Sequence, residues 1–480
     1  MPSISYRAWL FVFSGAAVFF VIVAAAIIFS RGNGADIEPA FAIADEKIED
    51  EKIISTYEEN EFENEIENKK NENEFENENE NEKNKTEFEN ETAENKPPAH
   101  ARLAFVGDIM CHADQLTAAK NSDGYDFHYA FEKIAPYIRA ADFALGNLET
   151  TLVREKFAGW PLFRSPKAFA EAIRDAGFDM VTTGNNHSFD AGVEGVRSTI
   201  EILGEVGLAF TGTYLTPESR DEISVVEVNG FSFAILNFTM HTNAIDFGEN
   251  NFMVKIIYHD LVAQATIDYE MIRENMARAR ALQTDFIIVS PHLGIEYYGT
   301  MNKQGAGHRH DNFDRSDSRW VNWIRTLELF LDEGADFVLN HHPHTLLPAE
   351  FVYVPRENAE PRRAFVAYSL ANFVSGQRTQ PRETGAIIYV DVARDEHGEA
   401  FISAASYVPV WVKNSCFTIL PVTEEFLDAN PERMRKIHND VTHMFSGEPL
   451  ENFAHEYEIT RSRLREEFPG LPRWGSLPWR

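Results

Sequence analysis

Cysteine and basic residues are both scarce in this chain of 480 residues. It has two cysteines, Cys111 and Cys416, which excludes a disulfide-stapled scaffold and a cysteine-rich zinc module. Its 44 Lys and Arg stand against 76 Asp and Glu, so the formal net charge is −32. A nucleic-acid binder needs clustered basic residues to contact phosphates, so this composition argues against a nucleic-acid partner.

Charged side chains are missing altogether from a run of 23 residues, Ala8–Ser30. At about 1.5 Å per helical residue, this run can cross a bilayer core of about 30 Å. The alternative is a cleaved signal peptide, whose apolar region is usually about 7–15 residues long and ends at small residues. Because the apolar run continues past the small residues Ala24–Ala26, we expect an uncleaved transmembrane anchor at residues 8–30, behind a stub of residues 1–7.

Arginines flank the predicted span on both sides, at Arg7 and Arg31, so the charge bias that orients membrane helices is nearly nil. The simpler topology has a short cytoplasmic stub and an exported body. We therefore expect a single-pass protein of the cell membrane whose main domain is extracytoplasmic.

Residues 31–98 are rich in Glu, Asn and Lys, as in Asn71–Asn81. Such a sequence has too few apolar residues to form a core, so we expect a disordered linker. Whether it is a tether that holds the body off the membrane or simply an unconstrained spacer stays open. After Pro97 and Pro98 we expect an ordered domain at 99–395 and a partly helical extension at 396–480 that packs on it.

The predicted domain alternates strands with amphipathic helices, and a polar cluster follows each strand. The apolar runs are Leu103–Val106, Phe143–Leu145, Phe178–Val181, Phe286–Val289 and Phe337–Leu339. The helix candidates are Lys167–Ala176, Val193–Val206, Leu261–Leu282 and Trp320–Glu333. This alternation predicts an α/β fold with helices on both sides of the sheet, where ligands bind beyond the carboxyl ends of the strands.

Taken singly, the polar residues have structural explanations: Asp108 could close a turn, Glu149 could begin a helix, and His187 could be a loop histidine. His342 and His344 differ, because a spacing of two on an extended segment points both rings to one side. One Asp, one Glu, one Asn and three His at separate strand ends suit Mn, Fe or Zn. Two such ions about 3.5–4 Å apart would polarise a phosphoryl oxygen and generate the nucleophile, while a nearby His could protonate the leaving group.

Six spaced motifs carry a resemblance to a known family. They are GDIM (Gly107–Met110), NLET (Asn147–Thr150), NNHSFDAG (Asn185–Gly192), PHLGIEY (Pro291–Tyr297), HHPHTLLP (His341–Pro348) and YSLANF (Tyr368–Phe373). In this order they resemble the CapA family of capsule-synthesis proteins, whose domain is similar to the calcineurin-like metallophosphoesterases. The resemblance covers roughly residues 101–390 and implies a metallophosphoesterase-like sandwich of β-sheets flanked by helices.

The resemblance also implies a site with two divalent metal ions. The implied ligands are Asp108 and His344 for the first ion, Asn186, His292 and His342 for the second, and Glu149 as the bridge between them. His187 would be the catalytic acid, and Asp190 would orient its ring.

Two departures from the phosphoesterase pattern concern the first ion. The family begins with Asp-x-His, whereas Met110 stands two residues after Asp108, and whether His112 replaces the missing ligand stays open. The second family motif has Asp where Asn147 and Glu149 stand. The fold is therefore expected more firmly than catalysis.

Three functions follow as expectations. The first is a membrane-anchored, exported CapA-like protein in poly-γ-glutamate capsule synthesis or export, with other subunits of that machinery as partners. The second is a metal-dependent phosphoesterase acting on an envelope or nucleotide phosphate. The third is a non-catalytic module that binds a γ-glutamyl or peptidoglycan-type ligand.

Overall fold

The computed structural model describes residues 100–243, 247–258, 267–297, 318–356, 359–379, 381–413, 415–445 and 476–477. Within these ranges, no helix combines the length and apolar character needed to cross a membrane. The predicted anchor at 8–30 and the predicted linker at 31–98 lie outside the described residues, as does much of the predicted extension beyond residue 445.

The larger sheet has eight strands in the described part of the chain. They are β1 (His100–Ile109), β4 (Phe143–Leu148), β7 (Met180–Thr182), β8 (Ala209–Thr211), β15 (Asn372–Val374), β16 (Thr384–Arg394), β17 (Ala400–Lys413) and β18 (Thr418–Pro421). Their order is β18-β17-β16-β1-β4-β7-β8, with β15 paired to β1. β1 runs parallel to β4 and β15 and antiparallel to β16.

Among the residues that the structure describes, the second sheet has seven strands. They are β9 (Ser224–Val228), β10 (Phe231–Thr239), β11 (Phe286–His292), β12 (Phe337–Leu339), β13 (Ala349–Arg356), β14 (Ala359–Ala367) and β19 (Ser476–Leu477), in the order β19-β13-β14-β12-β11-β10-β9. At the centre of this sheet, the neighbouring strands β10, β11, β12 and β14 are paired in parallel.

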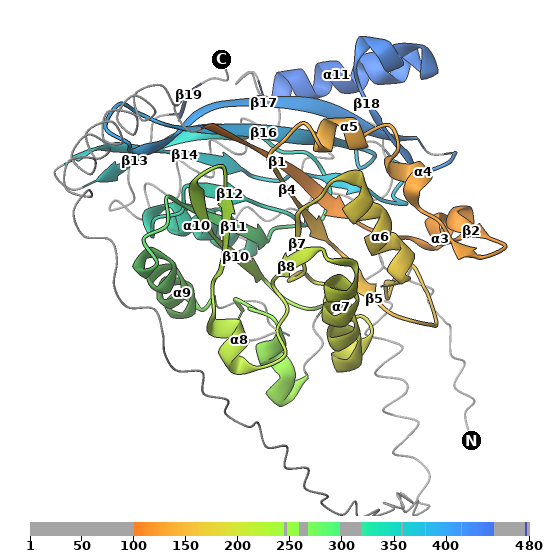
Figure 1. Cartoon of the computed structure of the whole chain (residues 1–480), viewed down its shortest axis with the longest axis horizontal. Helices are drawn as coiled ribbons and strands as arrows, with labels where there is room; N and C mark the ends of the chain where they lie inside the picture. The colour runs from red at the N-terminus through yellow and green to blue at the C-terminus, as the bar shows by residue number, and fades with distance from the viewer. Residues whose placement is uncertain are drawn as a thin grey trace, which may run out of the picture. The chain divides into compact units, whose positions relative to one another are not determined.

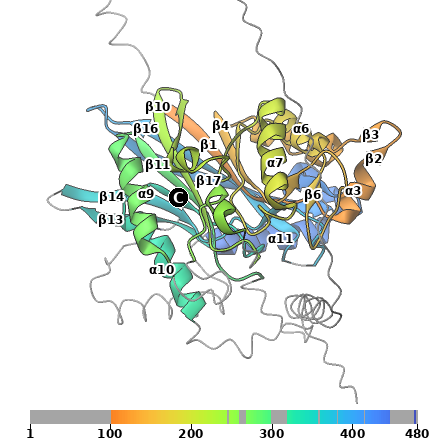
Figure 2. The same ribbon diagram turned by 90° about the horizontal axis from the view of Figure 1, so that it is seen from below.

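The two sheets pack face to face, and helices cover their outer faces (Figures 1 and 2). Side chains alternate along β1, so Phe105 enters the core between the sheets, where its ring lies 5.8 Å from that of Phe337, while Ala104 and Val106 face the outer helices. Those helices are α3 (Ala113–Ala119), α4 (His128–Phe131), α5 (Ala135–Ile138), α6 (Lys167–Ala176) and α7 (Gly192–Val206). On the opposite side, α9 (Tyr269–Ala281) and α10 (Ser318–Asp332) cover the second sheet. The predicted α/β class, with stacked sheets between helices, is confirmed.

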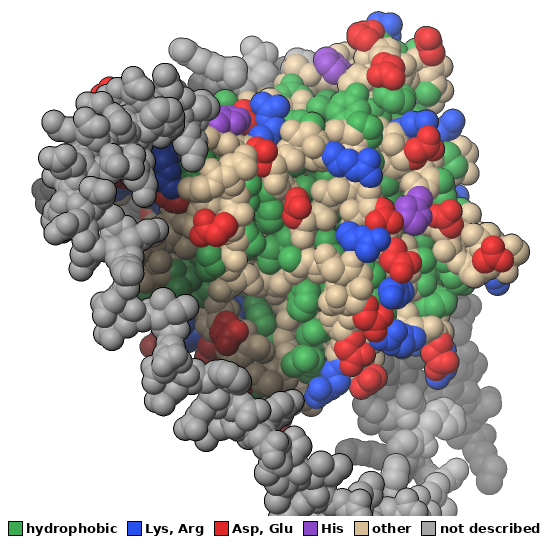
Figure 3. Space-filling model, in the orientation of Figure 1, with side chains coloured by type: hydrophobic (Ala, Val, Ile, Leu, Met, Phe, Trp, Pro, Cys, Tyr) green, Lys and Arg blue, Asp and Glu red, His purple; other side chains and the backbone are tan. Residues whose placement is uncertain are grey.

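The remaining elements are short or peripheral. They are α8 (Pro217–Asp221), the 3₁₀ helices η1 (Gly248–Met253) and η3 (Glu424–Ala429), α11 (Pro431–Phe445), and the strand pairs β2 (Lys120–Asn121) with β3 (Gly124–Tyr125) and β5 (Thr151–Leu152) with β6 (Arg164–Ser165). α11 packs on β17, with the ring of Phe445 4.7 Å from that of Tyr407. On the face seen in Figure 3, acidic and basic side chains are interspersed among apolar ones, so that face has no concentrated charge of one sign.

Candidate metal centre

The six predicted metal ligands all lie at or just beyond the carboxyl ends of strands from both sheets. Asp108 ends β1, Glu149 follows β4 and Asn186 follows β7 in the larger sheet, whereas His292 ends β11 and His342 and His344 follow β12 in the second sheet. All six side chains are buried. The stacking of the two sheets therefore brings together residues that are more than 200 positions apart in the chain, as Asp108 and His344 are.

These residues form two groups whose ligand atoms lie within 4.8 Å of one another, and Glu149 belongs to both. Asp108 and His344 complete the first group, and His292 and His342 complete the second. Glu149 Oε1 lies 3.5 Å from His292 Nε2 and 3.8 Å from His344 Nε2. This is the arrangement expected of a carboxylate that bridges two cation sites.

In the first group, hydrogen bonds fix which nitrogen of His344 faces the site. Its Nδ1 lies 3.0 Å from both Asp108 Oδ2 and Asn372 Oδ1. The Asn372 amide donates to Gln377 Oε1 and to the carbonyl of Arg382, so its oxygen is the atom that faces His344. Because carboxylate and amide oxygens only accept here, Nδ1 carries the hydrogen and Nε2 offers its lone pair towards Glu149.

The charge state of Asp108 is set by its neighbours. Burial alone would raise the pKa of this carboxyl, but the imidazoles of His341 and His344 outweigh burial and hold the pKa well below its usual range. By contrast, burial and the nearby Asp108 carboxylate raise the pKa of Glu149 well above its usual range. Two carboxylates this close together can both be ionised at the same time only if a cation lies beside them.

In the second group, three candidate ligand atoms converge. His292 Nε2 lies 2.8 Å from Asn186 Oδ1 and 3.1 Å from His342 Nδ1. Burial lowers the pKa of His292 and of His342 well below the usual range, so both rings favour the neutral form that binds metals. Neutral imidazoles and an amide oxygen around one carboxylate suit a divalent cation of intermediate softness.

The backbone that presents His342 and His344 differs from the expected extended segment. Both residues have positive φ angles, 94° and 56°, so the segment is a tight bend and the prediction of an extended strand is wrong. Non-glycine residues in this conformation carry strain that usually persists only where the surrounding structure enforces it.

Next to Asp108, the backbone passes very close to a neighbouring segment at Gly107. A Cβ atom there would meet the carbonyl oxygen of Ala371 at 1.9 Å.

Glu149 provides the test of whether these residues fit a metal. Both of its carboxylate oxygens are buried, and neither has a hydrogen-bond partner in the described part of the protein. An orphaned buried carboxylate is costly unless a cation compensates it. Surrounded by imidazoles, an amide oxygen and a second carboxylate, Glu149 fits divalent cation binding.

His187 and Asp190 lie beside the two groups as a hydrogen-bonded pair. Asp190 Oδ2 lies 2.7 Å from His187 Nδ1 and also accepts from the backbone N–H of Phe163 at 2.6 Å. Burial raises the pKa of Asp190, and the adjacent His187 opposes that shift. His187 Nε2 points inward, 3.9 Å from Glu149 Oε1, so Asp190 holds the ring with its free nitrogen at the centre.

Several residues around the centre were not singled out from the sequence as part of it. His341 Nδ1 is buried 3.3 Å from Asp108 Oδ1, and His241 and Asn243 follow β10, where Asn243 Oδ1 accepts from Asn186 Nδ2 at 3.1 Å. The strand-then-polar pattern that located the other clusters also occurs at β10. His112, considered as a replacement ligand, belongs to neither group.

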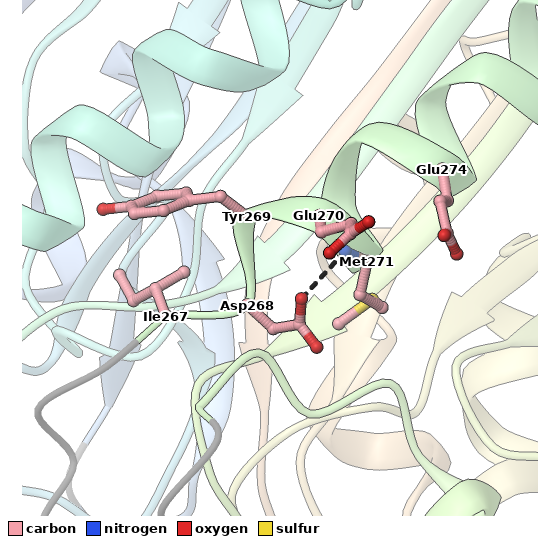
Figure 4. Close-up of a pocket in the computed structure, with 6 residues that line it drawn as sticks. All are labelled: Ile267, Asp268, Tyr269, Glu270, Met271 and Glu274. Atoms are coloured by element: carbon pink, nitrogen blue, oxygen red, sulfur yellow. Dashed lines mark hydrogen bonds between the residues drawn. The ribbon is translucent and has the colours of Figure 1, made fainter.

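A separate surface pocket of about 380 Å³ lies at the start of α9. It is lined by Ile267, Asp268, Tyr269, Glu270, Met271 and Glu274 (Figure 4). Asp268 accepts from the backbone N–H of Met271 there, which is a helix cap, and the lining contains none of the residues of the two groups.

Comparison with known proteins matches residues 102–377 to the family described as bacterial capsule synthesis protein PGA_cap. The chain is 28% identical over 295 residues to the PGA biosynthesis protein CapA of Bacillus subtilis (strain 168), and 24% identical over 299 residues to the capsule biosynthesis protein CapA of Bacillus anthracis. Each alignment covers 60% of this chain, and they cover 66% and 63% of those relatives, so the chain spans less than two thirds of either. The ligands and the His187–Asp190 pair all lie within the matched range.

Similar solved structures include a putative 5′-nucleotidase from Staphylococcus aureus, with a TM-score of 0.39, 14% identity and coverage of 71% of this chain and 58% of that chain. A purple acid phosphatase from yellow lupin has a TM-score of 0.25, 11% identity and coverage of 68% and 53%. These scores are too low to carry an argument about function.

Proposed function

Since the chain belongs to the bacterial capsule synthesis protein PGA_cap family, we propose that it serves capsule biosynthesis as a metal-dependent phosphoesterase with a metallophosphoesterase-like fold. The observation that carries the proposal is Glu149, whose buried and unpartnered carboxylate lies between two groups of ligand residues. Stability alone gives no reason to bury such a group, whereas catalysis by a pair of divalent cations does.

Each proposed ion has its own set of residues. Asp108 and His344 Nε2 would hold the first, His292, His342 and Asn186 Oδ1 would hold the second, and Glu149 would belong to both. Ions bound there, of Mn, Fe or Zn, would polarise a phosphoryl oxygen and activate the attacking water. The departure at Met110 leaves the first ion with fewer predicted ligands, and His341, beside Asp108, is placed to add one.

His187 is the proposed proton donor. Asp190 accepts from Nδ1 and fixes the orientation of the ring, so that Nε2 can deliver a proton to the leaving oxygen of the substrate. The edge of the Phe163 ring packs against His187 at 4.6 Å and limits rotation of the imidazole. These two contacts keep the donor atom facing the centre throughout the reaction.

The proposal also concerns the polymer, the location of the protein and its partners. The name of the Bacillus subtilis relative refers to PGA biosynthesis, which supports a role in poly-γ-glutamate synthesis or export. The proposed substrate is an envelope or nucleotide phosphoester. Residues 8–30 would anchor the protein in the cell membrane with the body outside, next to other subunits of that machinery. The uncharged run of 23 residues supports this location.

The test uses the full chain purified in detergent, with metal content measured by elemental analysis and turnover measured on p-nitrophenyl phosphate and its bis-ester. We expect near-stoichiometric metal and hydrolysis, loss of metal in Asp108→Ala, and loss of turnover with metal retained in His187→Asn. His128→Asn, a change at an exposed histidine, serves as the control. Metal binding without turnover on either ester would contradict catalysis and favour the ligand-binding alternative.

A further inference from the structure

Two histidines outside the ligand groups share an unusual hydrogen-bond arrangement. His112 Nδ1 accepts the backbone N–H of Gly376 at 3.0 Å, and His241 Nδ1 accepts the backbone N–H of Asn243 at 3.1 Å. A ring nitrogen that accepts a hydrogen bond carries no proton, so the neutral ring must carry its proton on Nε2. Both rings are therefore set as Nε2–H donors.

The surroundings of both rings keep them uncharged. Burial, together with the neighbouring His344 and His187, lowers the pKa of His112 to about 3. Burial lowers the pKa of His241 to about 4, again with a contribution from His187. Neutral donors add no positive charge beside a centre that is built to hold cations.

The two donors approach the centre from different sheets. His241 follows β10, and its ring lies edge-on to the ring of His342 at 5.9 Å. His112 follows β1, and its ring packs on the Phe163 ring at 4.8 Å, which in turn packs on His187. One donor is thus beside the second ligand group, and the other is on the side of the proposed proton donor.

Each ring is held in place by its neighbours. A Cβ atom at Gly376 would lie 2.5 Å from Cβ of His112, so a glycine is needed for this approach. Asn243, which holds His241, is itself tied to Asn186. Within the described residues, the hydrogen-bond geometry gives Nε2 of neither ring a protein partner, and neither atom is fully buried. Both N–H groups therefore remain available to a ligand.

We propose that His112 and His241 are neutral hydrogen-bond donors that bind the non-bridging oxygens of a phosphate ester from two sides of the metal centre. This inference rests on the proposed function, because it assumes a phosphate group at the centre. It assigns to His112 a role in recognising the ligand, in place of the metal-ligand role considered from the sequence. An N–H group donates to a phosphate oxygen and offers no lone pair to a cation, so these two nitrogens would select the phosphate group.

The first experiment measures the binding of inorganic phosphate to the full-length, metal-loaded protein by calorimetry. His112→Phe and His241→Phe remove the donor but keep a ring, and each should weaken phosphate binding roughly tenfold or more. His112→Gln and His241→Gln keep an N–H donor and should recover part of that loss. His128→Phe, at an exposed histidine paired with Asp126 and Asp175, is the matched control and should change nothing.

Metal content and kinetics separate this role from others. Both Phe variants should retain the metal content of the wild type and should raise KM for p-nitrophenyl phosphate more than they lower kcat. Loss of metal in His112→Phe would identify His112 as a ligand instead and overturn the inference. Unchanged phosphate affinity in both Phe variants would also overturn it, as would a wild-type protein that binds metal but no phosphate.

A measurement on the metal-free protein distinguishes failure of this inference from failure of the proposed function. Nitrogen chemical shifts of ¹⁵N-histidine should show His112 and His241 with the proton on Nε2 between pH 6 and pH 8, roughly the range where an ordinary histidine titrates. The Nδ1–H form at either residue would overturn the inference whatever the activity. If phosphate binds as expected but no ester is hydrolysed, the proposed catalysis fails while the recognition role stands.

Discussion

Replacing Glu149 by Gln tests the centre most directly, because the change keeps the shape of the side chain and removes its charge. Glu149 is the one residue common to the two ligand groups. Glutamine offers a single weak acceptor where the carboxylate offers two, and its NH₂ group would face the imidazole nitrogens of His292 and His344. We therefore expect Glu149→Gln to lose both ions, whereas His342→Ala and His344→Ala should each lose one.

The size of the effect follows from binding linkage. An ion present at 100 times its Kd stabilises the folded protein by about 2.7 kcal/mol, so two ions contribute about 5 kcal/mol. For a body of this size, that corresponds to a rise in Tm on the order of 10 °C. We expect this rise for the wild type, about half of it for the single-site variants, and none for Glu149→Gln.

The assay combines elemental analysis with thermal unfolding, each at matched free metal concentrations. The metal-free Tm values of the variants should lie close together, which shows that the substitutions leave the fold intact. If Glu149→Gln kept two ions per chain, or lost only one of them, Glu149 would not bridge the sites and the reasoning from its unpartnered oxygens would be refuted.

Three further outcomes are expected away from that residue. Burial lowers the pKa of Lys255 from 10.5 to about 8, so between these values the folded protein binds fewer protons than the unfolded chain and its stability rises with pH. Lys255→Met should therefore be more stable than the wild type at pH 7, by at most about 3 kcal/mol in denaturant titrations. Above about pH 10.5 the two proteins should be equally stable. A difference in unfolding free energy that widens with pH would contradict this. Gly107→Ala places a Cβ atom against the carbonyl of Ala371 and should destabilise the fold by about 1–3 kcal/mol or more in the same assay, whereas an unchanged midpoint would show that the backbone yields easily. Asn372→Leu removes an acceptor from Nδ1 of His344 and should weaken binding of one of the two ions about 10–100-fold in metal titrations, leaving the other intact; equal loss of both ions would contradict a local effect.

The helices and central strands could be predicted because each carries a local signal. The predicted helix at 167–176 matches α6, since its apolar residues repeat at helical spacing and Gly177 ends it with a φ of 110°. The predicted strand at 337–339 matches β12, and α11 is a helix within the extension that was predicted to be partly helical. The edge strand β18 and its neighbour β17 were not foreseen. β17 alternates buried and exposed residues irregularly, and its place is set by pairing with β16, which local sequence does not reveal.

The site residues could be predicted because strands in such sheets end at a common edge, but their contacts could not. Which clusters face one another depends on how the two sheets stack, and that packing joins His344 to Asp108 across 236 positions of sequence. His241 was missed for the same reason, since a single histidine after β10 has no meaning until β10 is placed beside β11. Nor does composition show that a backbone N–H holds one nitrogen of that ring.

His342 and His344 lie together with the other predicted ligands, but on a backbone that differs from the predicted one. On an extended segment both rings would point to one side. On the bend at positive φ, the ring centroids lie 6.1 Å from each other, and His342 belongs to the second group and His344 to the first. With this backbone conformation, one short segment supplies a ligand residue to each of the two groups joined by Glu149. Relaxing that bend should uncouple the two sites before it unfolds the protein.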